Sequence, residues 1–234
     1  MTSMFEMLMN LPLFRGVSHT RLAEIVGDIK LHFLKYPAGE KIVRVGEPCD
    51  HLTFVISGAV QTYMENDSGR FAIYQTLKAP AVITPDFMFG RFTTYPCTAE
   101  ALESTGILKI SKQDFVNILG SDPVFMFNYL NTLSVNSQKS TRGILWLTNG
   151  SIDERLAFWI ISLTQPGSTD IRLVCRKRDL CSLFGVQRAT FEAGLKEMKE
   201  RGLIEYSTRE ISVNNRADML SLLEHAAEHE HADD

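Results

Sequence analysis

The feature that most constrains the fold is the segment 179–213, which reads as a helix, a tight turn, a second helix and a two-stranded wing. In the second helix Phe191, Leu195 and Met198 recur at steps of four and three residues, so they form one apolar stripe that a helix buries. A Gly-Val dipeptide supplies the turn before it, and Arg188 is expected to project outward from the opposite, polar face. A short helix with a buried stripe and an exposed polar start is what the major groove of double-stranded DNA accepts.

Charge is distributed unevenly along the chain. The formal net charge of the 234 residues is −4, which by itself argues weakly against a nucleic-acid-binding protein. Residues 176–209, however, hold eight Lys or Arg against five Asp or Glu, a balance of +3, so the rest of the chain carries −7. Attraction to phosphate is local at physiological salt, because charges more than a Debye length apart are screened. The basic segment is therefore either a phosphate-contacting surface or an ordinary solvated helical face.

The composition is that of an ordinary globular protein, with 44% hydrophobic and 22% charged residues. No apolar run reaches the length of a membrane span, and no positive charge precedes the first apolar stretch as it does in a signal peptide. We therefore expect a cytoplasmic protein with no membrane partner. The four cysteines are scattered without a Cys/His metal pattern, so they are expected to be reduced and packed. In the acidic tail, His225 and His229 share a face if the tail is helical, but a solvated tail is favoured over a metal site.

Three zones follow one another along the chain. Residues 1–118 open with a short helical piece, after which short apolar runs alternate with turn signals, as in a barrel or double-sheet roll. Residues 119–149 predict a long helix that ends at an Asn-Gly pair. Residues 150–234 predict a helix that opens with a capping box at 151–154, then the helix-turn-helix with its wing and the acidic tail.

The long helix carries a heptad seam, because apolar or small residues recur along it at alternating steps of four and three. Such a seam packs either on the roll of its own chain or on a second copy across a two-fold axis. Its persistence over seven positions favours self-pairing. The seven positions are Met126, Leu130, Leu133, Ser137, Ser140, Ile144 and Leu147.

The order of these parts resembles the Crp/Fnr family of bacterial transcription regulators, over nearly the whole chain. The pieces that carry the resemblance are LPLFRGVSHTRLAEI at 11–25, YPAGEKIVRVGEPCDHLTFVISGAVQTY at 36–63 and RDLCSLFGVQRATFEAGLKEMKERGLI at 178–204. The resemblance implies an α+β fold: a cyclic-nucleotide-binding-like roll, a dimerisation helix and a winged helix-turn-helix. It also implies a homodimeric, sequence-specific regulator whose partners are near-palindromic double-stranded DNA, a second copy of the chain and RNA polymerase.

The end of the roll departs from the family's phosphate cassette. Family members that bind cyclic nucleotides carry a Gly-Glu pair there and, about ten residues later, an Arg followed by a small hydroxyl residue. This chain has 84–85 (Thr-Pro) and 95–96 (Tyr-Pro) at those places. Without a guanidinium the phosphate loses a bidentate contact, so cyclic AMP is not expected as effector, although Arg91 from a shifted loop is an alternative. The stretch predicts either an apolar effector pocket or a roll packed shut. The pocket candidates are Phe87, Phe89, Arg91, Phe92 and Tyr95.

On the expected recognition helix, Arg188 occupies a position where family members bond guanine. An arginine can bond O6 and N7 of guanine together. Gln187 either pairs with adenine or reaches a phosphate, and Glu192 either accepts from cytosine N4 or pairs with Lys196. Ala193 stands where the family commonly has Arg, which predicts an operator different from the familiar one. The candidates are Gln187, Arg188, Ala189, Thr190 and Glu192 for base contacts, and Lys177, Arg178, Lys199 and Arg209 for phosphates.

Other functions fit less of the sequence. A ligand-binding signalling module whose helix-turn-helix serves protein contacts has the same parts, and an absent or salt-independent affinity for DNA would identify it. An enzyme built on the roll, as in cupins, needs clustered His and carboxylate ligands, whereas His19, His32 and His51 do not cluster. Iron–sulfur-binding relatives carry several cysteines near the N-terminus, where this chain has none before Cys49. The sequence therefore predicts a regulator that is not an enzyme and holds no cofactor, with an unidentified effector.

Overall fold

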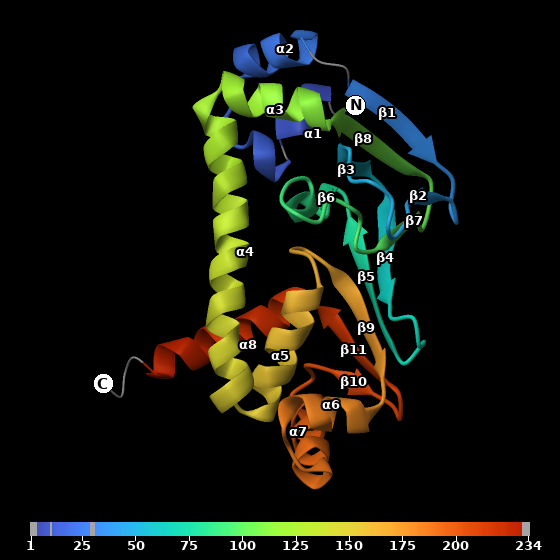
Figure 1. The fold of residues 1–234 in the computed structure, drawn as a ribbon, viewed down its shortest axis with the longest axis vertical. Coiled ribbons are helices and arrows are strands. Elements are labelled where there is room, and N and C mark those ends of the chain that lie inside the picture. Colours follow the sequence, from blue (N-terminus) through green and yellow to red (C-terminus); the bar gives the residue numbers. More distant parts are fainter. Residues whose placement is uncertain (1–3, 10, 29–30, 231–234) are drawn as a thin grey trace. The chain divides into compact units, whose positions relative to one another are not determined.

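The computed structural model describes residues 4–9, 11–28 and 31–230 (Figure 1). Its helices are α1 (Met4–Met9), η1 (Pro12–Phe14), α2 (His19–Asp28), η2 (Pro85–Phe87), α3 (Lys112–Ser121), α4 (Pro123–Asn149), α5 (Ile152–Leu163), α6 (Lys177–Phe184), α7 (Arg188–Glu200) and α8 (Arg216–Glu230), where η marks a 3-10 helix. Its strands are β1 (Leu31–Tyr36), β2 (Lys41–Val43), β3 (His51–Ser57), β4 (Ala59–Glu65), β5 (Phe71–Lys78), β6 (Ala81–Ile83), β7 (Thr98–Ala101), β8 (Thr105–Ser111), β9 (Thr169–Cys175), β10 (Glu205–Tyr206) and β11 (Glu210–Asn215).

The chain divides into two compact units. Unit 1 comprises Met1–Thr62 and Leu77–Ser137, and unit 2 comprises Tyr63–Thr76 and Gln138–Asp234. The segment 63–76, which holds the end of β4, the turn and most of β5, thus belongs with the C-terminal unit although it interrupts unit 1 in sequence. The predicted zones did not separate this segment.

Unit 1 contains the predicted double-sheet roll. One sheet has the strand order β1-β8-β3-β6, with β8 antiparallel to both β1 and β3. In the other, β7 lies between β2 and β4. Strand residues such as Leu52 and Phe54 are fully buried in one hydrophobic core with Phe115 of α3 and Phe125 of α4. This confirms the α+β roll, while α3 and the short β6 were not predicted.

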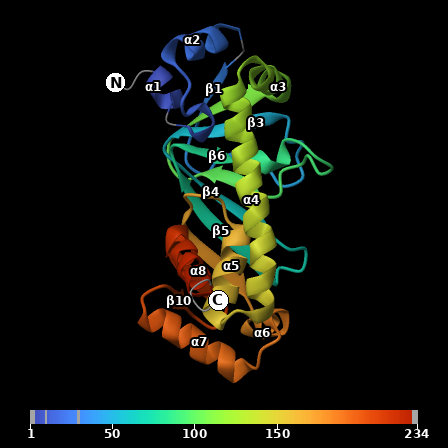
Figure 2. The same ribbon diagram turned by 90° about the vertical axis from the view of Figure 1, so that its left-hand side faces the viewer.

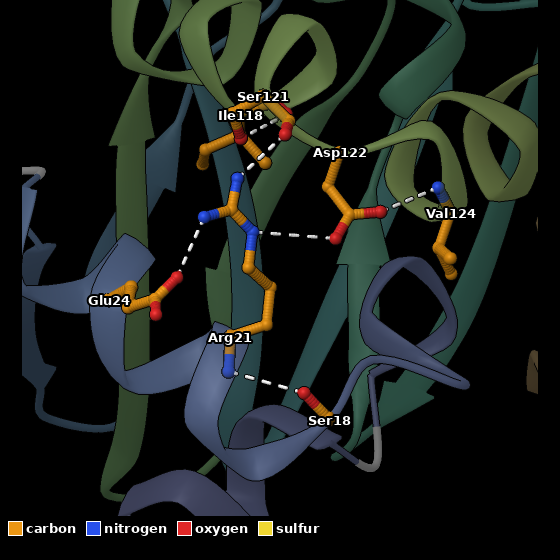
Figure 3. A network of polar contacts seen from close by, with 7 residues as sticks. All are labelled: Ser18, Arg21, Glu24, Ile118, Ser121, Asp122 and Val124. Carbon is orange, nitrogen blue, oxygen red and sulfur yellow. Dashed lines mark hydrogen bonds and ion pairs between the residues drawn. The ribbon is translucent and has the colours of Figure 1, made fainter.

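A polar network holds α2 against the junction of α3 and α4 (Figure 3). The guanidinium of Arg21 donates to the Ser121 carbonyl at 2.6 Å and to the Glu24 carboxylate at 2.8 Å. Its Nε lies 3.5 Å from Asp122. Asp122 in turn accepts from the backbone N–H of Val124 at 2.8 Å, which satisfies a free donor in the first turn of α4. One arginine therefore ties three helices of unit 1 together.

Unit 2 is a sheet with the order β10-β11-β9-β5 covered by helices. Residues Phe71–Thr76 of β5 pair antiparallel with β9, and the ring of Phe71 lies 5.3 Å from that of Trp159 on α5. The helix α5 begins with the predicted capping box, in which Ser151 and Glu154 each accept from the other's backbone N–H. The strand β9 was not predicted.

Steric crowding explains why a glycine, Gly194, stands in the middle of α7. A Cβ built on Gly194 would lie 2.7 Å from Cγ2 and 2.8 Å from Cβ of Ile152, at the start of α5. The two helices are close enough there that no larger side chain fits without movement. The close approach of α5 and α7 explains why position 194 holds a glycine, although glycine in a helix interior costs about 1 kcal/mol of stability relative to alanine.

Candidate nucleic-acid interface

The turn between α6 and α7 depends on the backbone of one glycine. Gly185 adopts the left-handed conformation, with φ 65°, which is strained for residues with a side chain. Its N–H and that of Val186 both bond to the carbonyl of Cys181, so they close the end of α6. The chain then enters α7, which Figure 2 shows along the outside of unit 2. The predicted helix, turn and helix are confirmed.

Burial of one stripe fixes which face of α7 is free. Phe191, Leu195 and Met198 are fully buried in the core of unit 2, as their spacing predicted. A neighbouring face, about a quarter turn around the helix from the stripe, carries charged side chains at steps of four, four and three residues, which a helix places in one row. The members of this charged face are Arg188, Glu192, Lys196 and Lys199. Lys196 was not among the sequence candidates, although its distance of eight residues from Arg188 places it on the same face.

An ion pair joins the first two members of the charged face. Nε of Arg188 donates to Oε1 of Glu192 at 2.9 Å, while the Arg188 side chain stays 78% exposed. This hydrogen bond lowers the pKa of Glu192 below its ordinary value. Lys196 lies instead 3.6 Å from Glu200. Of the two predicted roles of Glu192, pairing with Lys196 is therefore wrong, because the carboxylate is turned one helical turn the other way.

Two lysines meet over an aromatic ring of the wing. Nζ of Lys177, at the start of α6, lies 4.6 Å from the ring centroid of Tyr206 in β10, and Nζ of Lys199 lies 5.9 Å from it. Lys199 also donates to Glu205 at 2.6 Å, which raises the pKa of its ammonium group. Tyr206 was missed by sequence reasoning because the wing strand that holds it is only two residues long.

The remaining phosphate candidates are exposed. Arg178 is on the first turn of α6, 3.7 Å from Asp179. Arg209 lies in the turn between β10 and β11, which closes with a 2.8 Å bond from the Ser207 N–H to the Glu210 carbonyl. Gln187 is the N-cap of α7, yet its side chain makes no capping bond, so it is free to reach outward.

Thr190 differs from the other base-contact candidates. Although exposed, it lines a hollow of about 270 Å³ behind the charged face, between α7 and the start of α5. Asp153 lies on the other wall and bonds to Arg201 at 2.9 Å. Burial acts to raise the pKa of Asp153, but hydrogen bonds from Ser151 and Arg201 outweigh it and lower the pKa. Ala189, by contrast, is exposed on the first turn of α7 beside Arg188.

The predicted effector residues fall into three environments within unit 1. Phe87 and Phe89 are half-buried against its core, and the ring of Phe89 lies 5.9 Å from Tyr129 of α4. Arg91 and Phe92 point outward together, with the guanidinium 5.6 Å from a ring that is 72% exposed. The structure does not gather these four around one site with the fifth candidate, Tyr95.

Tyr95 is buried inside the roll. Its hydroxyl donates to the His51 carbonyl at 3.1 Å and lies 3.2 Å from the Thr53 hydroxyl. Burial raises the pKa of the phenol well above its usual range. The ring of Tyr95 is therefore part of the packed interior of the roll.

The heptad positions of α4 divide along the helix. Met126, Leu130 and Ser137 are exposed, and Leu133 is half-buried against the core of unit 1. Leu147 packs against the core of unit 2. The side chains of Ser140 and Ile144 lie outside the described part of the structure. Met126 is 44% exposed and Leu130 is 49% exposed, and the neighbouring Phe127 is 64% exposed.

The four cysteines are buried free thiols, as expected. Sγ of Cys49 lies 3.7 Å from Sδ of Met88, and burial raises the pKa of Cys97 to about 12. Across the residues that the structure describes, no three His, Cys, Asp or Glu side chains are grouped to hold a metal. The side chains of His225 and His229 are outside that part. Within the same residues, no helix is both long and apolar enough to cross a bilayer.

Comparison with known proteins identifies both parts of the chain. Residues 33–122 match the cyclic nucleotide-binding domain model, and residues 154–222 match the Crp-like helix-turn-helix domain model. The chain belongs to the Crp/Fnr family. It is 22% identical over 191 residues to the transcriptional activator protein anr of Pseudomonas aeruginosa, covering 79% of this chain and 77% of that one. It is 21% identical over 223 residues to the CRP-like cAMP-activated global transcriptional regulator of Mycobacterium tuberculosis, covering 91% and 96%.

The fold agrees with this membership. The catabolite activator protein of Thermus thermophilus has a TM-score of 0.51 to this chain at 19% identity, over 91% of this chain and 98% of that one. Crp/Fnr proteins are transcription regulators rather than enzymes, and a Crp-like helix-turn-helix is a DNA-binding element. The charged face of α7 lies within the part of the chain that matches the Crp-like helix-turn-helix domain.

Proposed function

We propose that this Crp/Fnr regulator is a cytoplasmic homodimer that binds a near-palindromic operator and contacts RNA polymerase there. The two copies of α7 enter successive major grooves about 34 Å apart. The observation that carries the proposal is the exposed row on α7, with Arg188 78% exposed at the end where recognition helices meet bases. Phosphate contacts come from Lys177, Arg178, Lys199 and Arg209, in α6, α7 and the wing.

Pairing of α4 across a two-fold axis accounts for its open apolar side chains. Met126 and Phe127 lie one turn before Leu130, and each of the three residues is about half exposed or more. A second copy of the same helix covers such a face with a matching one, because a two-fold interface presents the same residues from both sides. Dimerisation also supplies two recognition helices, one for each half of a palindromic operator.

We propose further that cyclic AMP is not the effector and that no cofactor is held. Tyr95 places a buried phenol where binding members carry the arginine, and its hydroxyl is already bonded inside the roll. Arg91 is on the outside, beside Phe92. Titration calorimetry of the purified protein with cyclic AMP is expected to give no binding heat at micromolar concentrations, and a Kd in that range would contradict this part of the proposal.

Selection of duplexes from a random library by the purified protein tests the regulator directly. We expect an enriched near-palindrome and a Kd that rises steeply with salt, because each neutralised phosphate contributes about 0.9 to the slope of log K against log salt. Arg188→Ala is expected to weaken binding to the selected duplex by about 1–3 kcal/mol and to relax one base position. Absent or salt-independent DNA binding would favour the alternative, a signalling module whose helix-turn-helix contacts proteins.

A further inference from the structure

The ion pair at the start of α7 is directional. Two acidic residues of α7 form ion pairs with basic side chains of the charged face: Glu192, one turn after Arg188, and Glu200, about three turns after it. The Glu200 carboxylate lies 3.6 Å from Nζ of Lys196, whereas the Glu192 carboxylate accepts from Nε of Arg188 at 2.9 Å. The carboxylate of Glu192 is therefore turned toward the N-terminal end of the helix, where the base-reading side chain stands.

The atom that Glu192 holds determines what is left free. A guanidinium has five N–H donors in a fixed plane, one on Nε and four on the two terminal nitrogens. With Nε–H given to Glu192, the two terminal nitrogens remain as a fork at the exposed tip. That fork is the part that bonds O6 and N7 of guanine together. The ion pair thus occupies the one donor that a guanine contact does not need.

Orientation of Arg188 also bears on selectivity. A long, 78% exposed arginine has many rotamers, and it loses that freedom when it forms a two-point contact. An arginine already held at Nε loses less rotamer freedom on binding, and the plane of its guanidinium is fixed before the helix enters the major groove. A loosely held guanidinium also reaches phosphates and neighbouring bases, so restraint favours one base over the others.

We infer that Glu192 is a positioning residue, which holds Nε of Arg188 so that its terminal fork selects one guanine of the operator. The inference depends on the proposed function, in which Arg188 reads a base. Glu192 acts through Arg188, so its effect appears at the operator position that Arg188 reads and disappears when Arg188 is absent.

Simple electrostatics makes a different prediction. Removing a carboxylate from a DNA-facing surface reduces repulsion, so it strengthens binding to every duplex alike. Positioning instead forecasts that Glu192→Ala binds a random duplex as well as or better than the unchanged protein, yet loses discrimination at one position. The two accounts therefore differ in discrimination between bases, which electrostatics leaves unchanged and positioning reduces, and both quantities are measured on the same samples.

The experiment uses the full-length protein and the duplex that it selects from a random library. Dissociation constants are measured for that duplex, for each of its single-base variants and for a random duplex of the same length. The variants are Glu192→Ala, Glu192→Gln, Arg188→Ala and the double variant of Glu192→Ala with Arg188→Ala. Glu200→Ala is the matched control, because it breaks the same kind of ion pair on the same helix, away from Arg188. Unchanged melting temperatures show that all five fold.

For the unchanged protein we expect discrimination of roughly tenfold to a hundredfold at one G·C position. Glu192→Ala is expected to reduce this discrimination to less than about threefold. Glu192→Gln is expected to keep an intermediate value, because its amide oxygen still accepts from Nε. Glu200→Ala is expected to leave the discrimination unchanged. The double variant is expected to match Arg188→Ala.

Two results would overturn the inference while the proposed function stands. One is retention of full discrimination by Glu192→Ala. The other is additive loss in the double variant with relaxation at a second base pair, which would mean that Glu192 reads a base itself. If the unchanged protein selects no sequence at all, the proposed function fails and the inference fails with it.

Discussion

Arg216 shows how much of unit 2 is held by a single buried side chain. It is the only charged residue in the buried class within the described part of the chain. Nε donates to the Thr164 hydroxyl at 3.2 Å and Nη2 to the Ile161 carbonyl at 3.1 Å, at the C-terminal end of α5. A cation there is favourable for the helix dipole, although burial lowers the pKa of the guanidinium to about 10.

Arg216→Ala is expected to destabilise the protein by about 2–4 kcal/mol, because it removes a buried charged side chain that donates to the Thr164 hydroxyl and to the Ile161 carbonyl. Urea unfolding followed by circular dichroism measures the change. Arg178→Ala, which removes an exposed arginine of the same unit, serves as the control and is expected to change stability by less than about 0.5 kcal/mol. Equal effects of both substitutions would count against the capping role of Arg216.

Gly194 gives a second prediction at this scale. Gly194→Ala improves helix propensity by about 1 kcal/mol, yet we expect a net destabilisation of about 1–3 kcal/mol because the new methyl group meets Ile152. Gly120→Ala in α3, where a Cβ has open space, is expected to stabilise the protein. Thermal melting distinguishes the two, and Ile152→Ala combined with Gly194→Ala should recover part of the loss. A stabilised Gly194→Ala protein would show that the helices separate easily.

At the scale of elements, local patterns were readable and distant pairings were not. The stripe of α7 and the capping box of α5 are set by residues within a turn or two, so their spacing alone predicted them. The strand β9 alternates as well, with Ile171, Leu173 and Cys175 buried and the residues between them exposed or half-buried. What could not be predicted is its pairing with β5, about a hundred residues upstream, because no local signal reports such a partner. The meeting of Lys177 and Lys199 over Tyr206 was out of reach for the same reason.

The heptad pattern of α4 leads to a prediction about assembly. Leu130→Lys is expected to weaken dimerisation at least a hundredfold, because it sets two like charges against each other in a paired apolar seam. Sedimentation velocity over a range of concentrations measures the change. Val116→Lys, at a residue of similar exposure on α3, is the matched control and should leave the assembly unchanged. A Leu130→Lys protein that still dimerises would place the interface elsewhere.

At the scale of the whole molecule, binding strength depends on a basic surface in an acidic chain. The net charge is −4, yet the surface of α6, α7 and the wing gathers arginines and lysines. Affinity for DNA is therefore governed by ionic strength rather than by total charge.

Arg209→Ala is expected to weaken binding to selected and random duplexes equally. In a dimer it should reduce the slope of log K against log salt by about 2, since two phosphate contacts are lost. Fluorescence anisotropy at several salt concentrations measures the slope. Arg44→Ala, which removes an exposed arginine of unit 1, should leave it unchanged. Loss of affinity for the selected duplex alone would instead make Arg209 a base-reading residue.

The membership of segment 63–76 in unit 2 has a practical consequence for anyone who divides this protein. A recombinant piece that starts at residue 138 keeps the pairing of β9 with β11 but lacks β5, so the backbone donors and acceptors on the β5 side of β9 are left without partners and Trp159 loses the ring of Phe71. Open strand edges recruit other molecules. Such a piece is therefore expected to self-associate in light scattering, and supplying the missing fourteen residues as a tethered peptide should restore a dispersed, folded species.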